Sequence, residues 1–294
     1  MQDLLGLGDA KKVRAVAGLA GGIGHQGAAC GALVGGALAL GLASARADED
    51  QETIVARGSM YVGDYVRRFK KEYGSTLCSE ITGTDFDDDA QLRRYILTKS
   101  RGCVKLASKA ASIMCDIIAQ PHCEPDEFFR SLNRAFADNN FHCAHSVFVM
   151  ASEELNIPPA CPPNMLIPLN GGIGYSGGTC AALLGGCIGI GVVKGGDTSQ
   201  GGALGVARRL ILTLIQGKGA FNRLDLSPAN DALLRCAELS KWFAKKFGSR
   251  TCRDIVKIDF HDKRRADEFF DRKIISNCVA MAKETARRAG ELAR

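Results

Sequence analysis

Apolar residues recur every three or four positions along most of the chain, which is the spacing of helices with one buried face. Stretches that alternate with period two are short, so an all-α fold is expected. Proline and glycine indicate loops at Pro158–Pro168 and Gly195–Gly202. The periodicity predicts helices over Tyr61–Tyr73, Ala90–Gln120, Asp126–Asp138, Phe141–Asn156, Val206–Gln216, Ala229–Phe247 and Ala266–Ala293.

Two segments are apolar on all sides, Ala28–Ala45 and Thr179–Val193. Both are rich in glycine and shorter than the roughly 20 residues that a membrane-crossing helix needs. We therefore expect buried helices at these positions and no membrane span.

The chain contains an internal duplication. Residues 21–36, GGIGHQGAACGALVGG, recur as residues 171–186, GGIGYSGGTCAALLGG, and ten of the sixteen positions are identical. Residues 73–86, YGSTLCSEITGTDF, recur as residues 247–260, FGSRTCRDIVKIDF, and the sequence around Cys103 recurs around Cys278. The matches keep their order, which predicts a duplicated helical bundle domain with glycine-rich loops. We place the first repeat at residues 1–120 and the second at residues 121–294.

Cysteine is the unusual feature of the composition, with 12 residues against one tryptophan. The chain does not open with a basic stretch, an apolar core and a small-residue cleavage site, so we expect a cytoplasmic protein without a disulfide framework. The high number of cysteines then indicates metal binding or redox chemistry. The net charge of +6 is concentrated in Lys241–Arg294, which holds 15 basic and 8 acidic residues and could attract an acidic partner protein. We expect no nucleic-acid partner.

Seven cysteines belong to the duplicated pattern. The second repeat has four, Cys143, Cys180, Cys252 and Cys278, and the first repeat has counterparts of three, Cys30, Cys78 and Cys103. Thiolates from separate helices can meet in a bundle core and bind zinc or an iron–sulfur cluster. The spacing matches neither paired zinc motifs nor ferredoxin motifs, so it leaves the metal open. The unmatched Cys115, Cys123, Cys161, Cys187 and Cys236 are expected to be packing residues.

The glycines before Cys180 suggest a second element of the site. Amides of Gly172, Gly174 and Gly177 could donate hydrogen bonds to cluster sulfide or to an anion. The same glycines fit a dinucleotide-binding pattern, but no adequate strand precedes them. Because a helix N-terminus lowers a thiol pKa, Cys180 and Cys30 are expected to form thiolates readily.

The order of these elements resembles the C-GCAxxG-C-C family of redox-active proteins. A lone cysteine at Cys143, a glycine-rich loop entering the helix at Cys180, FGSRTC and a late cysteine at Cys278 follow the family pattern. Thr179 stands where the family has glycine, and Gly185 falls one place late. The first repeat departs further, with Ala29 before Cys30 and Gly31 after it. We expect it to be truncated at its N-terminus, because it has no counterpart of Cys143.

The resemblance implies a helical domain whose four cysteines hold a redox centre. A relative fused to haem, the split-Soret cytochrome, suggests an iron–sulfur cluster of the [2Fe–2S] kind in an anaerobe-type protein. The expected function is electron transfer to a redox partner, as a homo-oligomer or a subunit of a larger complex, rather than stand-alone catalysis. Two alternatives remain open: a metal-free thiol–disulfide oxidoreductase, and a structural or assembly subunit that binds zinc.

Overall fold

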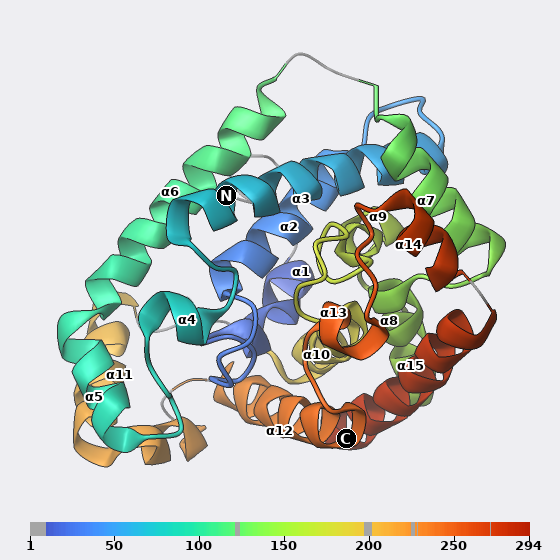
Figure 1. The fold of residues 1–294 in the computed structure, drawn as a ribbon. Helices are drawn as coiled ribbons and strands as arrows, with labels where there is room; N and C mark the ends of the chain where they lie inside the picture. The colour runs from blue at the N-terminus through green and yellow to red at the C-terminus, as the bar shows by residue number, and fades with distance from the viewer. Residues whose placement is uncertain (1–9, 121–123, 197–201, 225–226, 228, 271) are drawn as a thin grey trace.

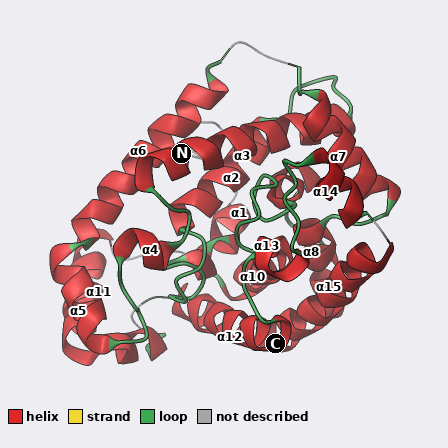
Figure 2. Ribbon diagram, viewed as in Figure 1, coloured by secondary structure: helices red, strands yellow, loops and turns green. Residues whose placement is uncertain are grey.

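Helices account for most of the described backbone. The computed structural model describes residues 10–120, 124–196, 202–224, 227, 229–270 and 272–294, and this part of the chain contains helices, turns and two isolated bridges but no strand (Figures 1 and 2). The all-α prediction is therefore confirmed.

The two repeats contribute helices in corresponding order. Those of the first are α1 (Ala10–Ala15), η1 (Ala17–Leu19), α2 (Gly31–Ala43), α3 (Gln51–Tyr73), α4 (Cys78–Thr82), α5 (Asp89–Thr98) and α6 (Ser100–Ile118). Those of the second are α7 (Glu127–Asp138), α8 (Cys143–Glu154), α9 (Pro163–Leu166), η2 (Ile167–Leu169), α10 (Ala181–Lys194), α11 (Gly202–Gln216), η3 (Gly217–Asn222), α12 (Ala229–Phe247), α13 (Cys252–Val256), α14 (Lys263–Phe269) and α15 (Arg272–Ala293).

The predicted helices differ from the observed ones mainly at their ends. The structure divides two of the long predicted helices, Ala90–Gln120 at Lys99 and Ala266–Ala293 after α14. The sequence does not reveal these junctions, because apolar spacing continues across a junction when both helices bury the same face. Helix α3 begins ten residues earlier than predicted, where the Asp50 carboxylate accepts a hydrogen bond from the Thr53 amide. The predicted loop Pro158–Pro168 contains the short helix α9. The predicted loop Gly195–Gly202 lies largely outside the described residues.

The two apolar segments form α2 and α10, which are buried as predicted. Within the described ranges, no helix is both long and apolar enough to cross a membrane.

The repeats interlock through reciprocal contacts. Helix α1 of the first repeat packs on α10 of the second, and α9 of the second packs on α2 of the first. A Cβ atom added at Gly191 of α10 would lie 2.2 Å from the Ala15 carbonyl oxygen, and one at Gly41 of α2 would lie 2.3 Å from the Asn164 carbonyl oxygen. The two positions are equivalent in the duplication, so the repeats are related by an approximate twofold arrangement.

The same exchange joins each glycine-rich loop to the long helix of the other repeat. Gly174 approaches the backbone of Gly63 in α3, and Gly24 approaches the backbone of Ala237 in α12. One continuous hydrophobic core contains buried side chains from both repeats. Each glycine-rich loop is therefore packed against the other repeat.

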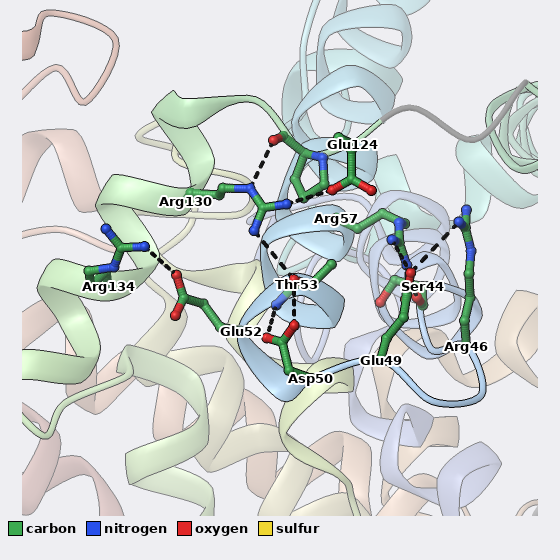
Figure 3. Close-up of polar contacts among 11 residues, drawn as sticks. Ser44, Arg46, Glu49, Asp50, Glu52, Thr53, Arg57, Glu124, Arg130 and Arg134 are labelled. Atoms are coloured by element: carbon green, nitrogen blue, oxygen red, sulfur yellow. Dashed lines mark hydrogen bonds and ion pairs between the residues drawn. The ribbon is translucent and has the colours of Figure 1, made fainter.

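Polar contacts also fasten α3 of the first repeat to α7 of the second (Figure 3). The Arg134 guanidinium pairs with Glu52 at 2.7 Å, and the Arg130 guanidinium donates to the Thr53 hydroxyl at 3.3 Å. Buried Arg57 donates to the Ser44 carbonyl at 3.1 Å and pairs with Glu49, which fixes the connection between α2 and α3.

Candidate cysteine sites

All four predicted cysteines of the second repeat line one closed cavity. Cys143 is the first residue of α8, Cys180 precedes α10, Cys252 is the first residue of α13, and Cys278 lies near the start of α15. Each of these side chains is buried. Apolar residues complete the lining: Phe141, Ala181, Ala182, Ile255, Val256, Phe260, Phe269 and Met281, together with Gly171 and Gly172. Four thiols separated by as many as 135 positions therefore share one water-poor space.

Backbone hydrogen bonds hold the central cysteines next to each other. Thr179 and Thr251 form an isolated antiparallel bridge, the Cys180 amide donates to the Arg250 carbonyl at 2.7 Å, and the Cys252 amide donates to the Gly178 carbonyl at 2.7 Å. The Cys143 amide donates to the Asn170 side-chain oxygen at 3.0 Å. Three of the four cysteines are thus positioned by their main chain rather than by side-chain packing alone.

The glycine-rich loop adopts a left-handed turn. The five consecutive residues from Gly171 to Tyr175 all have φ between 61° and 80°. Ile173 and Tyr175 are not glycines, and a left-handed conformation is costly for them, but both are buried and held by the surrounding core. Residues 21–25 of the first repeat repeat this conformation. The duplicated sequence therefore encodes an unusual backbone.

Most backbone amides of this loop donate hydrogen bonds to carbonyls of the loop itself or of the residues just before it. The Gly174 amide donates to the Pro168 carbonyl and the Gly177 amide to the Gly171 carbonyl, each at 2.9 Å. The prediction that these two amides are open to a cluster or an anion is therefore wrong. Gly172 has a different role, because its Cα faces Cys252 and a Cβ there would lie 2.8 Å from the Cys252 Cβ. Gly172 therefore brings backbone close to a thiol, and the Gly171 amide donates a hydrogen bond to Cys143 that lowers the pKa of this thiol.

The cavity favours protonated thiols. Burial raises the pKa of Cys143 to about 12 and that of Cys180 to about 11. Burial and, to a smaller extent, the neighbouring thiols also raise the pKa values of Cys252 and Cys278 well above the ordinary thiol value. Amides of Ala182 and Leu183 at the start of α10 lower the pKa of Cys180, but this effect is smaller than burial. Burial also raises the pKa of Cys30. The expectation that Cys180 and Cys30 form thiolates readily is therefore wrong for the protein without a bound metal.

The space between the four thiols is small. The cavity measures about 10 Å³, close to the volume that admits a single water molecule. Among the described residues, no group of three or more His, Cys, Asp or Glu side chains is placed to hold a metal ion. The thiols share a cavity, but they do not converge on one metal position.

The first repeat brings its three predicted cysteines into one neighbourhood. Cys30 precedes α2 and Cys78 begins α4, and the charges of Cys30 and Cys103 both act on the pKa of Cys78. In place of a fourth thiol, the hydroxyl of Tyr95 on α5 forms a hydrogen bond with Cys103. Cys30 and Cys103 are only half-buried, whereas their counterparts Cys180 and Cys278 are buried.

A buried hydrogen bond connects the two sites. The Ala29 amide, next to Cys30, donates to the hydroxyl of Thr179, next to Cys180, at 3.0 Å. Thr179 stands where the family pattern has glycine. Its hydroxyl therefore has a structural use at the centre of the duplicated arrangement.

Several features of the sites were missed from the sequence. Tyr95 was not singled out from the sequence. Phe86 and Phe260 are aligned in the two repeats, and Tyr95 follows Phe86 at the same distance at which Phe269 follows Phe260, so Tyr95 and Phe269 are equivalent. Asn170 was also missed; it positions Cys143 and donates to the Nδ1 atom of His142, whose pKa is lowered to about 4 by burial. Neither residue belongs to a conspicuous motif, and only the alignment of the two repeats could have indicated Tyr95.

The other cysteines lie outside both sites. Cys187 and Cys236 are fully buried between α10 and α12, where the Cys236 thiol donates to the Cys187 carbonyl at 3.6 Å. Cys161 is buried and Cys115 is exposed, while Cys123 lies outside the described residues. The packing role predicted for Cys161, Cys187 and Cys236 agrees with their burial.

Comparison with known proteins gives one family. The family model described as "Putative redox-active protein (C_GCAxxG_C_C)" matches residues 1–117 and again residues 141–292. The tandem arrangement deduced from the duplication agrees with these two stretches. No curated protein and no solved structure matches the chain.

Proposed function

The chain belongs to the C-GCAxxG-C-C family, and from this premise we propose that its second repeat holds an iron–sulfur cluster and transfers electrons. The observation that carries the proposal is the closed apolar cavity lined by Cys143, Cys180, Cys252 and Cys278. Soft metals and iron–sulfur clusters are bound by cysteine thiolates, and the described residues that line the cavity include no carboxylate, imidazole or cation that would compete. The donor set therefore fits such a cluster, and the two-iron form remains the specific hypothesis.

The protonation of the thiols separates this proposal from thiol–disulfide exchange. An attacking cysteine has to be exposed and partly ionised near pH 7, whereas these four are buried with raised pKa values. Metal coordination removes the thiol proton directly, so a high pKa in the empty site does not prevent ligation. The structure thus supports buried ligands better than an exchange nucleophile.

The residues around the cavity would have defined tasks. The bridge between Thr179 and Thr251 keeps Cys180 and Cys252 adjacent, and the aromatic lining excludes water. A bound cluster would supply one-electron transfer at this position. Because the present cavity has room for about one water molecule, loading requires the side chains that line it to rearrange.

The test is metal and sulfide analysis with a visible spectrum on protein purified without oxygen. We expect iron and acid-labile sulfide in equal amounts, and absorption between about 320 and 460 nm that bleaches on reduction. Cys252→Ser should lose this absorption, while Cys115→Ser, an exposed cysteine outside both sites, should keep it. Cys78→Ser measures how much of this absorption comes from the first repeat.

Other outcomes would contradict the proposal. One zinc per chain without sulfide would indicate the structural alternative. A colourless, metal-free protein that takes up two electrons per cysteine pair would indicate thiol–disulfide chemistry instead.

A further inference from the structure

A cleft of about 970 Å³ lies where the two repeats meet. One wall comes from α3 and the turn after it in the first repeat, and the other comes from α7, α13 and the glycine-rich loop of the second (Figure 1). Its volume is within the range of about 300–1,000 Å³ that is typical of clefts for cofactor-sized molecules. The thiol cavity is a separate space, since none of the described residues lines both.

The cleft reaches the backbone that carries two of the four thiols. Gly178, Thr251 and Arg253 line it, and Cys252 lies between the last two in the sequence. The Cys252 amide donates to the Gly178 carbonyl at 2.7 Å, and Gly178 precedes Cys180 by two residues. A molecule bound in the cleft would therefore be separated from the thiol cavity by this layer of backbone.

The first repeat narrows the equivalent space. There, Gln26 and Gly27 of the glycine-rich loop line a smaller cavity of about 440 Å³. The Arg250 guanidinium donates to the Gln26 side chain at 3.5 Å, and Lys241 of α12 pairs with Asp87 at 3.3 Å. Both contacts tie α12, or the turn after it, to loops of the first repeat.

The duplicated positions beside the four-cysteine site differ at each of these contacts. Thr76 replaces the arginine and Ser176 replaces the glutamine, and both side chains are shorter. His261 replaces the aspartate and Arg67 replaces the lysine, so two basic side chains stand where the first repeat has an ion pair. Arg67 pairs with Asp64 of its own helix instead. The cleft is therefore open at the repeat that has all four cysteines.

The lining of the cleft suits a planar molecule of low charge. Phe128 of α7 stacks with His261 at a distance of 5.4 Å between ring centres and an angle of 13°. Thr76 and Gln120 add hydrogen-bond donors and acceptors. Three basic and four acidic side chains nearly balance, so the cleft does not select a strongly charged ligand. An aromatic ring with donors and acceptors along its edge fits these groups.

We propose that this cleft binds a flavin, which exchanges electrons with the cluster of the second repeat; the exchange rests on the proposed function. An iron–sulfur cluster transfers electrons singly, and flavins can do the same, whereas nicotinamide cofactors transfer hydride. A quinone ring carries only acceptors at its edge, whereas the flavin ring carries donors and acceptors. The flavin therefore meets both the chemical and the redox requirements of the cleft.

Electrons and protons balance for reduction of the cluster by a reduced flavin. One reduced flavin loses two electrons and two protons in two single-electron steps and becomes the oxidised flavin. Two oxidised clusters, on two chains, each gain one electron, and the protons pass to water.

Flavin binding is measured by equilibrium dialysis and calorimetry on the purified protein, with riboflavin and flavin mononucleotide as probes. We expect one flavin per chain and a dissociation constant of about 1 µM, as for other ligands of this size. The two probes should agree within about tenfold, because the ring provides the contacts. Absence of binding by either probe at about 100 µM overturns the proposal, and so does binding of the phosphate form alone.

Residues imported from the first repeat should close the cleft. Thr76→Arg combined with Ser176→Gln reproduces the contact that narrows the first-repeat cavity, and His261→Asp removes the stacked ring. Each should weaken flavin binding about 30-fold or more, as loss of a central contact does. His261 is exposed, so its replacement should keep the protein folded by circular dichroism. Ser108→Arg, exposed on α6 and outside the cleft, is the matched control and should bind as the wild type does. Equal binding by all these variants contradicts the assignment of the cleft.

Electron exchange has its own readout. Reduced flavin added without oxygen, one molecule per two chains, should produce the paramagnetic resonance signal of the reduced cluster in the wild type and more slowly in the combined variant. A signal that forms equally fast in both overturns the exchange. Flavin binding needs no cluster: protein that binds flavin but contains no iron refutes the proposed cluster alone, and protein that contains the cluster but binds no flavin refutes this inference alone.

Discussion

Replacement of Gly172 by alanine tests whether the left-handed loop is needed to position Cys252. Gly172 has φ +80°, and an added Cβ would lie 2.7 Å from the Gly178 amide nitrogen and carbonyl oxygen and 2.8 Å from the Cys252 Cβ. A left-handed conformation costs a residue with a Cβ about 1–2 kcal/mol, and overpacking a core costs about 1–3 kcal/mol more. Gly172→Ala should therefore lower the free energy of unfolding by about 2–5 kcal/mol.

Gly248 offers a matched control for the backbone contribution. It has the same φ of +80°, but an added Cβ would meet no atom within 4 Å. Gly248→Ala should cost only the conformational part, about 1–2 kcal/mol. Urea unfolding followed by circular dichroism gives both values, and their difference isolates the contact with Gly178 and Cys252. Equal losses for the two variants would refute the argument that this glycine is required for close approach.

The equivalent glycine of the first repeat separates stability from function. At Gly22, with φ +77°, a Cβ would lie 2.5 Å from the Ala28 carbonyl oxygen and 2.8 Å from the Cys78 Cβ. Gly22→Ala should destabilise the protein about as much as Gly172→Ala. Only Gly172→Ala should reduce the iron and sulfide bound by the second repeat. Equal loss of iron in both variants would show that general destabilisation, and not displacement of Cys252, empties the site.

Two further predictions follow from thiol burial. In the native protein without metal, a thiol reagent should modify exposed Cys115 rapidly and the four cavity cysteines only after unfolding. As a control, Cys115→Ser should remove one fast-reacting thiol. Rapid labelling of Cys252 would contradict the closed cavity. Folding raises the pKa of Cys143 to about 12 and that of Cys180 to about 11, so the folded state holds protons that the unfolded thiols release above about pH 9. The contribution of these thiols to stability without metal should therefore be fully present below that pH and fall as the pH rises toward 11. Urea midpoints measured from pH 7 to 11 test this: above about pH 9 they should fall more steeply for the wild type than for Cys143→Ala, and wild-type midpoints that stay constant or rise would contradict the prediction.

The sequence was sufficient for the fold class and for grouping the cysteines. Apolar periodicity identified the helices, and the duplication indicated which thiols share a site, since Cys143, Cys180, Cys252 and Cys278 do line one cavity. Helix junctions such as Lys99 were not predictable, because periodicity does not register a break that keeps the same face buried. The thiol pKa values were misjudged because a local signal, the helix start at Cys180, was weighed without the burial that tertiary packing imposes.

The conformation of the glycine-rich loop was also beyond sequence reasoning. Glycines indicate that left-handed backbone is available, but Ile173 and Tyr175 adopt it too, and only the packing around them explains why. The Tyr175 hydroxyl donates to the Asn133 side chain at 2.9 Å, and the Asn133 amide donates to the Ser59 hydroxyl of the first repeat at 3.1 Å, so the Tyr175 side chain is held where the two repeats meet. Such contacts join residues far apart in the chain and leave no local pattern.

The interlocked packing of the repeats has a consequence for synthesis on the ribosome. Helix α2 needs α9, and the loop at Gly24 needs α12, so these parts of the first repeat lack partners until about 120 to 210 further residues have been made. At common translation rates this takes roughly 6 to 40 s. During that time its apolar helix and its three cysteines are accessible to chaperones and oxidants. A fragment ending near Gln120 would remain in this condition permanently, so the two halves of this duplicated chain have become dependent on each other.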